Sequence, residues 1–152
     1  MIVDVSHWKP VTNWSLAKKG CEFLISKATQ GTTYIDTYLD TFVANCEANN
    51  IPYWLYTFLD KGNEIGQTKF FVEQVNKRVG KNFVGYILDV ESKNTATGVQ
   101  EALNYLKHYK ELRKQGLRAY ADQYGPLTID SAKVGDHWDW ATQPWPWEGG
   151  MC

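Results

Sequence analysis

The sequence predicts an α/β protein in which parallel strands alternate with helices. Short β-rich runs alternate with segments in which apolar residues recur at i, i+3, i+4 and i+7. This alternation is typical of parallel βα units, which form either an open doubly wound sheet or a closed barrel. A regular eightfold barrel takes roughly 250 residues, so a chain of 152 residues has room only for a shortened or irregular one.

The expected strands are β-rich runs bounded by helical or turn-forming segments. They cover residues 2–6, 23–28, 53–58, 84–90, 117–122 and 137–142. Two helices between them carry an apolar stripe, one over residues 39–46 and one over residues 65–79. Both helices are expected to cover a sheet.

Capping residues predict the ends of two further helices. Thr12 or Asn13 is expected to cap a short helix that ends at Gly20. The longest helix is expected to begin at Thr97, because Thr97-Gly98-Val99-Gln100 has the form of a capping box, and to stop at Gly116.

Composition favours a single domain that binds neither nucleic acid nor membrane. Sixteen Lys and Arg balance seventeen Asp and Glu, and no run of like charge stands out. The longest nearly apolar run, residues 51–59, is far shorter than the roughly 20 residues that a membrane span needs. No linker or repeat divides the chain, so we expect one catalytic domain over residues 1–152, acting as a monomer.

The chain shows neither a signal peptide nor a metal-binding pattern. Asp4, His7 and Lys9 occupy the start, where a signal peptide would have a basic segment followed by an apolar one. The three cysteines form no CxxC or His/Cys cluster, and the histidines lie at no metal-ligand spacing. We therefore expect no metal and no cofactor.

Polar and aromatic residues collect where the expected strands end, which is where α/β folds place their chemistry. These residues are Asp4, Ser6, Lys27, Thr29, Tyr56, Phe58, Asp89, Glu91, Asp122, Thr142 and Gln143.

Asp89 and Glu91 are the most informative of these residues, because they end a strongly apolar strand. Residues i and i+2 of a strand point to the same face, about 6.7 Å apart. Two such carboxylates in a partly desolvated site separate in pKa, leaving one ionised and one able to donate a proton. Glycoside hydrolysis needs this division of roles, although the spacing also fits a solvated strand end or a divalent-cation site.

Asp4 favours the glycosidase interpretation, because it places a third carboxylate at the same edge; its alternative role is to cap the turn that follows. Ser6 and His7 do not suggest a nucleophilic triad, since neighbours on a strand point to opposite faces. Tyr56, Phe58 and Tyr124 are candidates to bind a sugar ring. Trp140 is a candidate for the same role or for the core.

Several segments resemble the glycoside hydrolase family 25 lysozymes. The resemblance is carried, in family order, by Val3-Asp4-Val5-Ser6-His7-Trp8, Ile25-Ser26-Lys27-Ala28-Thr29-Gln30-Gly31-Thr32-Thr33-Tyr34, Tyr53-Trp54-Leu55-Tyr56-Thr57-Phe58 and Leu88-Asp89-Val90-Glu91. Weaker matches follow at Ala119-Tyr120-Ala121-Asp122-Gln123-Tyr124 and at Trp140-Ala141.

The resemblance implies a peptidoglycan hydrolase that cleaves the β-1,4 bond between N-acetylmuramic acid and N-acetylglucosamine. Glu91 resembles the proton donor, Asp89 the carboxylate that stabilises the cationic centre, and Asp4 an acid that lines the site. The implied fold is an irregular, TIM-like β/α barrel with fewer helices than strands. The implied partner is cell-wall peptidoglycan, reached by secretion or by release at lysis as for a phage endolysin.

Three departures from the family pattern affect these expectations. Gln30 replaces a usual Glu, and Thr57 replaces a usual His, so one contact at the edge and one substrate hydrogen bond are expected to differ. The family's last strands, one of which bears a further Asp, have no counterpart after Trp140, which suggests a truncated or altered copy. The alternative function is therefore a non-catalytic glycan-binding domain or an inactive lysozyme fragment.

Overall fold

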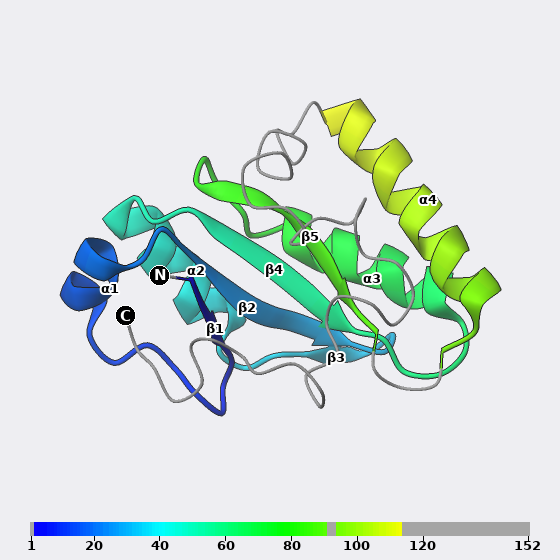
Figure 1. Ribbon diagram of the computed structural model, residues 1–152, viewed down its shortest axis with the longest axis horizontal. Coiled ribbons are helices and arrows are strands. Elements are labelled where there is room, and N and C mark those ends of the chain that lie inside the picture. The colour runs from blue at the N-terminus through cyan, green and yellow to red at the C-terminus, as the bar shows by residue number, and fades with distance from the viewer. Residues whose placement is uncertain (1, 91–93, 114–152) are drawn as a thin grey trace.

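The computed structural model describes residues 2–90 and 94–113 (Figure 1). The elements in chain order are β1 (Ile2–Val5), α1 (Trp14–Gly20), β2 (Phe23–Gln30), β3 (Tyr34–Ile35), α2 (Leu39–Asn49), β4 (Tyr53–Phe58), α3 (Glu64–Asn76), β5 (Phe83–Asp89) and α4 (Ala96–Arg113). The strands expected at residues 117–122 and 137–142, and the stop at Gly116, lie outside the described residues.

The sheet has the order β1-β2-β4-β5, and all three of these pairings are parallel. The short strand β3 was not expected from the sequence, and it pairs antiparallel with the end of β2 after a turn at Gly31, whose φ is 62°. A parallel sheet whose strands are joined through helices confirms the predicted α/β class.

Helices α2 and α3 lie behind the sheet in Figure 1 and cover the same face of it. Phe42 of α2 meets Tyr53 of β4 edge to face, with ring centroids 5.7 Å apart. Phe71 of α3 meets Tyr86 of β5 in the same way, also at 5.7 Å. Such pairs stabilise a core beyond the area that they bury, so they fix the two helices on this face. Every residue of β5 is buried, as expected for a parallel strand covered on both faces.

The start of α1 is as predicted, whereas the predicted start of α4 was wrong. Asn13 caps α1, because its Oδ1 accepts a hydrogen bond from the backbone N–H of Leu16 at 3.0 Å. At α4 the capping hydroxyl belongs to Thr95, which accepts from the N–H of Gly98 at 3.1 Å. The amide of Gln100 donates to Asn104 along the helix instead of closing a capping box.

The connection from β5 to α4 is anchored at its described ends on the segment that follows β4. The N–H of Leu59 donates to the carbonyl of Asp89 at 3.0 Å. The side-chain amide of Asn94 donates to the carbonyls of Leu59 and Asp60, at 3.3 and 2.8 Å. Both the end of β5 and the approach to α4 are therefore fixed on residues 59–60.

The buried carboxylate of Glu64 also anchors the connection from β5 to α4. Its Oε1 accepts hydrogen bonds from the N–H groups of Gly62 at 3.2 Å and Thr95 at 3.3 Å. Gly98 leaves room for this carboxylate, because a Cβ at that position would overlap Glu64 Oε2. Glu64 thus joins the start of α3 to the start of α4.

Glu64 is expected to make stability depend on pH. Burial by itself would raise the pKa of Glu64, but its own N–H, those of Gly62 and Thr95, and the Asn94 side chain hold it below its ordinary value of 4.5. Because the folded pKa lies below the unfolded one, the carboxylate stabilises the fold above the unfolded pKa and loses this effect as pH falls through the folded pKa. Glu64→Gln should lower the free energy of unfolding by on the order of 1 kcal/mol at pH 7 and by less at pH 3, measured by urea denaturation.

The exposed Glu73 on α3 provides the matched control. Glu73→Gln should change stability little at either pH. A loss in Glu64→Gln that is the same at pH 3 and pH 7 would contradict a role for the charge.

A buried pair of hydroxyls joins β2 to β4. Thr29 Oγ1 donates to Thr57 Oγ1 at 2.8 Å, Thr57 Oγ1 donates to the Thr29 carbonyl at 3.2 Å, and both residues are fully buried. Thr57→Val should cost about 1–3 kcal/mol, because it leaves a buried hydroxyl without its partner. The double variant Thr29→Val/Thr57→Val should cost less than the sum of the two single variants in urea denaturation. Additive losses would show that the two hydroxyls act independently.

Candidate active site

Strand register places three of the predicted site residues on one face of the sheet. Phe58 at the end of β4 is the Cα partner of Asp89 at the end of β5, and Tyr56 lies two residues before Phe58. Side chains alternate along a strand, and register partners point to the same side. Tyr56, Phe58 and Asp89 therefore share the face opposite Tyr86, whose ring packs on α3.

Asp4 on β1 belongs to the same face. Asp4 pairs with Ile25 on β2, Ile25 pairs with Trp54 on β4, and Trp54 pairs with Gly85 on β5. Gly85 lies four residues before Asp89 on the same strand. Four residues amount to roughly 13 Å along a strand. The strand tilt of a barrel, about 35–45°, produces an offset of this size across three strand spacings of about 4.8 Å. Asp4 and Asp89 thus share one face of the sheet, with an offset along the strands of the size that a barrel's tilt produces.

The two described acids differ in exposure. Asp89 is only 2% exposed at the end of a parallel strand, whereas Asp4 is half-buried. Tyr56 is 8% exposed, and Phe58 is half-buried. The predicted residues Glu91, Tyr124 and Trp140 lie outside the described residues.

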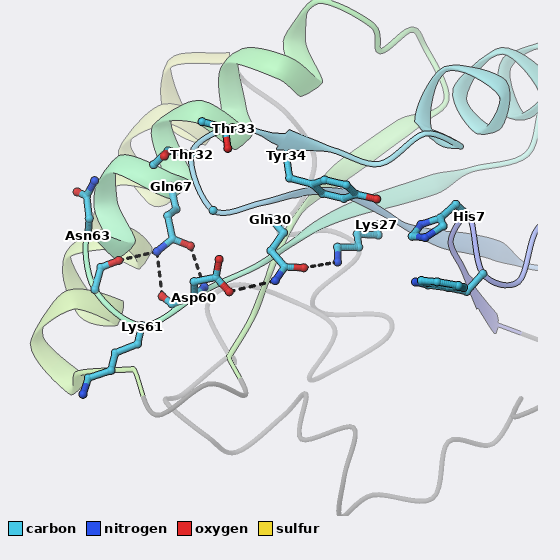
Figure 2. Close-up of a pocket in the computed structure, with 13 residues that line it drawn as sticks. His7, Lys27, Gln30, Thr32, Thr33, Tyr34, Asp60, Lys61, Asn63 and Gln67 are labelled. Carbon is cyan, nitrogen blue, oxygen red and sulfur yellow. Dashed lines mark hydrogen bonds between the residues drawn. The ribbon is translucent and has the colours of Figure 1, made fainter.

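A groove of about 650 Å³ lies at the carboxyl end of β2 (Figure 2). Three segments supply its walls: the turn after β1, the end of β2 with the turn to β3, and the segment between β4 and α3. The lining residues are His7, Trp8, Lys27, Gln30, Gly31, Thr32, Thr33, Tyr34, Asp60, Lys61, Gly62, Asn63 and Gln67. The groove is therefore lined by neither Asp4 nor Asp89, nor by Tyr56 or Phe58.

Lys27 connects the groove to the predicted site. Its Nζ lies 5.4 Å from the ring centre of Tyr34 and 5.6 Å from that of Phe58, which are cation–π distances. The same ammonium donates to Gln30 Oε1 at 2.6 Å. Phe58 thus lies between Lys27 on one side and its register partner Asp89 on the other.

Gln30 and Thr57, the two substituted residues among the departures from the family pattern, both make hydrogen bonds within the protein. Gln30 accepts from Lys27 and donates its amide N–H to Asp60 Oδ1 at 3.0 Å. A carboxylate at this position could only accept, so it would lose the contact with Asp60. The hydroxyl of Thr57 is fully buried against Thr29 and does not reach the groove.

Buried Gln67 fixes the wall of the groove between β4 and α3. Its amide Nε2 donates to the carbonyls of Asp60 at 2.9 Å and Gly62 at 2.6 Å. Its Oε1 accepts from the N–H of Asp60 at 2.8 Å, and Figure 2 shows these contacts closing the loop. One side chain thereby satisfies three backbone groups of the turn and holds Asp60 in place.

The sequence did not predict His7, Tyr34 or Gln67 as site residues. His7 lies in the first family-like segment and is excluded there as a base for Ser6, whereas in the structure its Nδ1 lies 2.7 Å from Asp36 Oδ2. These residues come from segments far apart in the chain and carry no spacing that would join them. The glycine of the turn at Gly31, which brings Tyr34 back toward Lys27, was the one local signal available.

Two negative findings apply to the described residues. Among the described residues, no three His, Cys, Asp or Glu side chains lie close enough together to hold a metal ion. None of the described helices is both long and apolar enough to span a membrane.

Solved structures with a similar fold include an endolysin domain, a muramidase and a lysozyme. The catalytic domain of the endolysin ply40 from bacteriophage P40 of Listeria monocytogenes is 22% identical, with a TM-score of 0.64 over 72% of this chain and 58% of that one. The muramidase from Trichobolus zukalii is 26% identical, with a TM-score of 0.54 over the same shares of the two chains. The bacterial lysozyme from Streptomyces coelicolor is 23% identical, with a TM-score of 0.52 over 82% of this chain and 57% of that one.

This chain therefore spans a little more than half the length of these structures. No curated protein matches it. The family model of the glycosyl hydrolases family 25 matches residues 3–125, a stretch that contains most of β1, including Asp4, the whole groove, and β5 with Asp89. The chain belongs to glycosyl hydrolase family 25.

Proposed function

We propose that this protein is a peptidoglycan hydrolase that cleaves the β-1,4 bond between N-acetylmuramic acid and N-acetylglucosamine. The observation that carries the proposal is the register, which puts Asp4, Phe58 and Asp89 on one face at the carboxyl ends of parallel strands. Membership of family 25 supports it, as do the endolysin, muramidase and lysozyme among the similar structures.

In the proposed reaction Glu91 is the general acid and Asp89 is the carboxylate that stabilises the positive charge. Glu91 donates its proton to the glycosidic oxygen as the bond from that oxygen to C1 of N-acetylmuramic acid breaks. The carboxylate of Asp89 stabilises the positive charge that develops at C1, with help from the N-acetyl oxygen of the substrate. Water then attacks C1 and returns a proton to Glu91. Asp4, on β1, lines the site and contributes its negative charge to the electrostatic field there.

Burial suits Asp89 to this role. A charge buried in a low-dielectric site acts more strongly on a developing cation than one in water. The carbonyl of Asp89 is bound to the N–H of Leu59, so the carboxylate projects from a fixed backbone and needs little reorganisation as the charge forms.

The aromatic residues are proposed to hold the sugar rings. Phe58 offers a ring beside Asp89, whereas Tyr56 is too buried to offer an open ring face and would contribute its edge or hydroxyl. Tyr124 and Trp140 complete the proposed set. The protein would act as a monomer on cell walls, after secretion or release at lysis.

Glu91→Gln should abolish hydrolysis without unfolding the protein. General acid catalysis contributes about 10²–10⁴-fold to rate, so a loss of at least 100-fold is expected. The measurement is clearing of purified bacterial cell walls together with release of new reducing ends. Glu101→Gln, an exposed change on α4, is the matched control and should retain full activity. Comparable activity in Glu91→Gln would overturn the assignment, and no clearing by a folded parent protein would favour a non-catalytic glycan-binding domain.

Removal of divalent cations should leave the activity unchanged. In the proposed reaction the carboxylates act on the substrate directly, and no step uses a metal ion. Cell-wall clearing is measured before and after dialysis against EDTA, and again after Mg²⁺ or Ca²⁺ is restored. Loss of activity in EDTA with recovery on adding the cation would contradict this mechanism and would indicate that Asp89 and Glu91 bind a divalent cation.

A further inference from the structure

We propose that His7 presents a hydrogen-bond acceptor to the glycan in the groove, and that Asp36 is the positioning residue that holds His7 in this role. The proposal rests on the proposed function, because it takes the occupant of the groove to be an N-acetylated sugar chain. It adds a specificity-determining residue outside the carboxylates and aromatic residues already assigned.

The contact between the two side chains decides which imidazole nitrogen carries the proton. His7 Nδ1 lies 2.7 Å from Asp36 Oδ2, and the Asp36 side chain is 0% exposed, whereas that of His7 is 25% exposed. An ionised carboxylate can only accept a hydrogen bond, so Nδ1 must be the donor. In the neutral ring Nε2 is then left as an acceptor.

Asp36 is itself held firmly. Its Oδ1 accepts from the N–H of Tyr38 at 2.9 Å, and its own N–H donates to the carbonyl of Ala28 at 2.8 Å. The Tyr38 hydroxyl in turn accepts from the N–H of Val11, in the segment that follows β1. The carboxylate therefore has a fixed position from which to orient His7.

His7 faces the groove among exposed aromatic rings. Its ring centroid lies 4.4 Å from that of Trp8, which is 80% exposed, and 6.5 Å from that of Tyr34. Figure 2 shows the hydroxyl end of Tyr34 directed toward His7, with Lys27 beside it. Flat apolar faces next to one acceptor suit a sugar ring, which has apolar faces and hydroxyl and acetamide donors at its edge.

A purely structural role for the pair would be to join the turn after β1 to the segment between β3 and α2. Two substitutions separate that role from the proposed one. In His7→Asn the side-chain amide takes the place of Nδ1–H and retains the bond to Asp36, but no atom replaces Nε2. In His7→Gln the amide reaches the position of Nε2 and gives up the bond to Asp36.

The experiment measures hydrolysis of soluble peptidoglycan fragments at pH 8. His7→Asn should raise KM about 3- to 10-fold and leave kcat and the urea midpoint nearly unchanged. His7→Gln should restore part of the affinity while lowering the midpoint. His108→Asn, an exposed change on α4, is the control and should alter neither. Normal KM in His7→Asn would overturn the proposal.

A second readout does not depend on catalysis. NMR of the imidazole nitrogens should show the Nδ1–H tautomer at His7, and addition of a tetramer of N-acetylglucosamine should shift the Nε2 resonance. Asp36→Asn should allow both tautomers, because an amide can donate or accept. An unshifted Nε2 at saturating tetramer would overturn the proposal. Binding without any Glu91-dependent hydrolysis would instead overturn the proposed function and leave this site standing.

Discussion

The register of the parallel sheet is the constraint on which the rest of the structure depends. Backbone hydrogen bonds between neighbouring strands decide which side chains share a face, and a slip of one residue would send each to the other face. Asp89 lies beside Phe58 because β4 and β5 pair in this register. The packing of Tyr53 and Tyr86 against α2 and α3 prevents such a slip, since it would bring Asp89 into the apolar layer under the helices.

The segment that follows β4 forms one wall of the groove and also anchors the connection between β5 and α4. On the groove side Gln67 closes the turn at Asp60, and on the other side Glu64 and Asn94 hold the start of α4. In all these contacts a side chain bonds to backbone groups of the turn or of the segment before α4. The wall of the groove and the approach to α4 are therefore built on one turn, so neither can move without disturbing the other.

Two departures from the family pattern, Gln30 and Thr57, are explained by their partners inside the protein. At Gln30 the amide can accept from Lys27 and donate to Asp60 together, which a carboxylate cannot do. At Thr57 the hydroxyl pairs with Thr29 across two buried strands, where an unpaired polar group would be costly. Both residues thus contribute to the scaffold that carries the proposed site.

The sequence by itself determined the α/β class, the four parallel strands that the structure describes, and the acids at their ends, because periodicity and strand-end polarity are local properties of the chain. Asp4 and Asp89 could be found in this way. Only the tertiary structure decided that His7 meets Asp36, 29 residues away, and that Lys27 lies over the ring of Phe58. The tertiary structure also determines that Thr95, and not Thr97, caps α4, because the N–H of Thr95 donates a hydrogen bond to Glu64. Such contacts join segments brought together by strand order and packing, about which a local pattern carries no information.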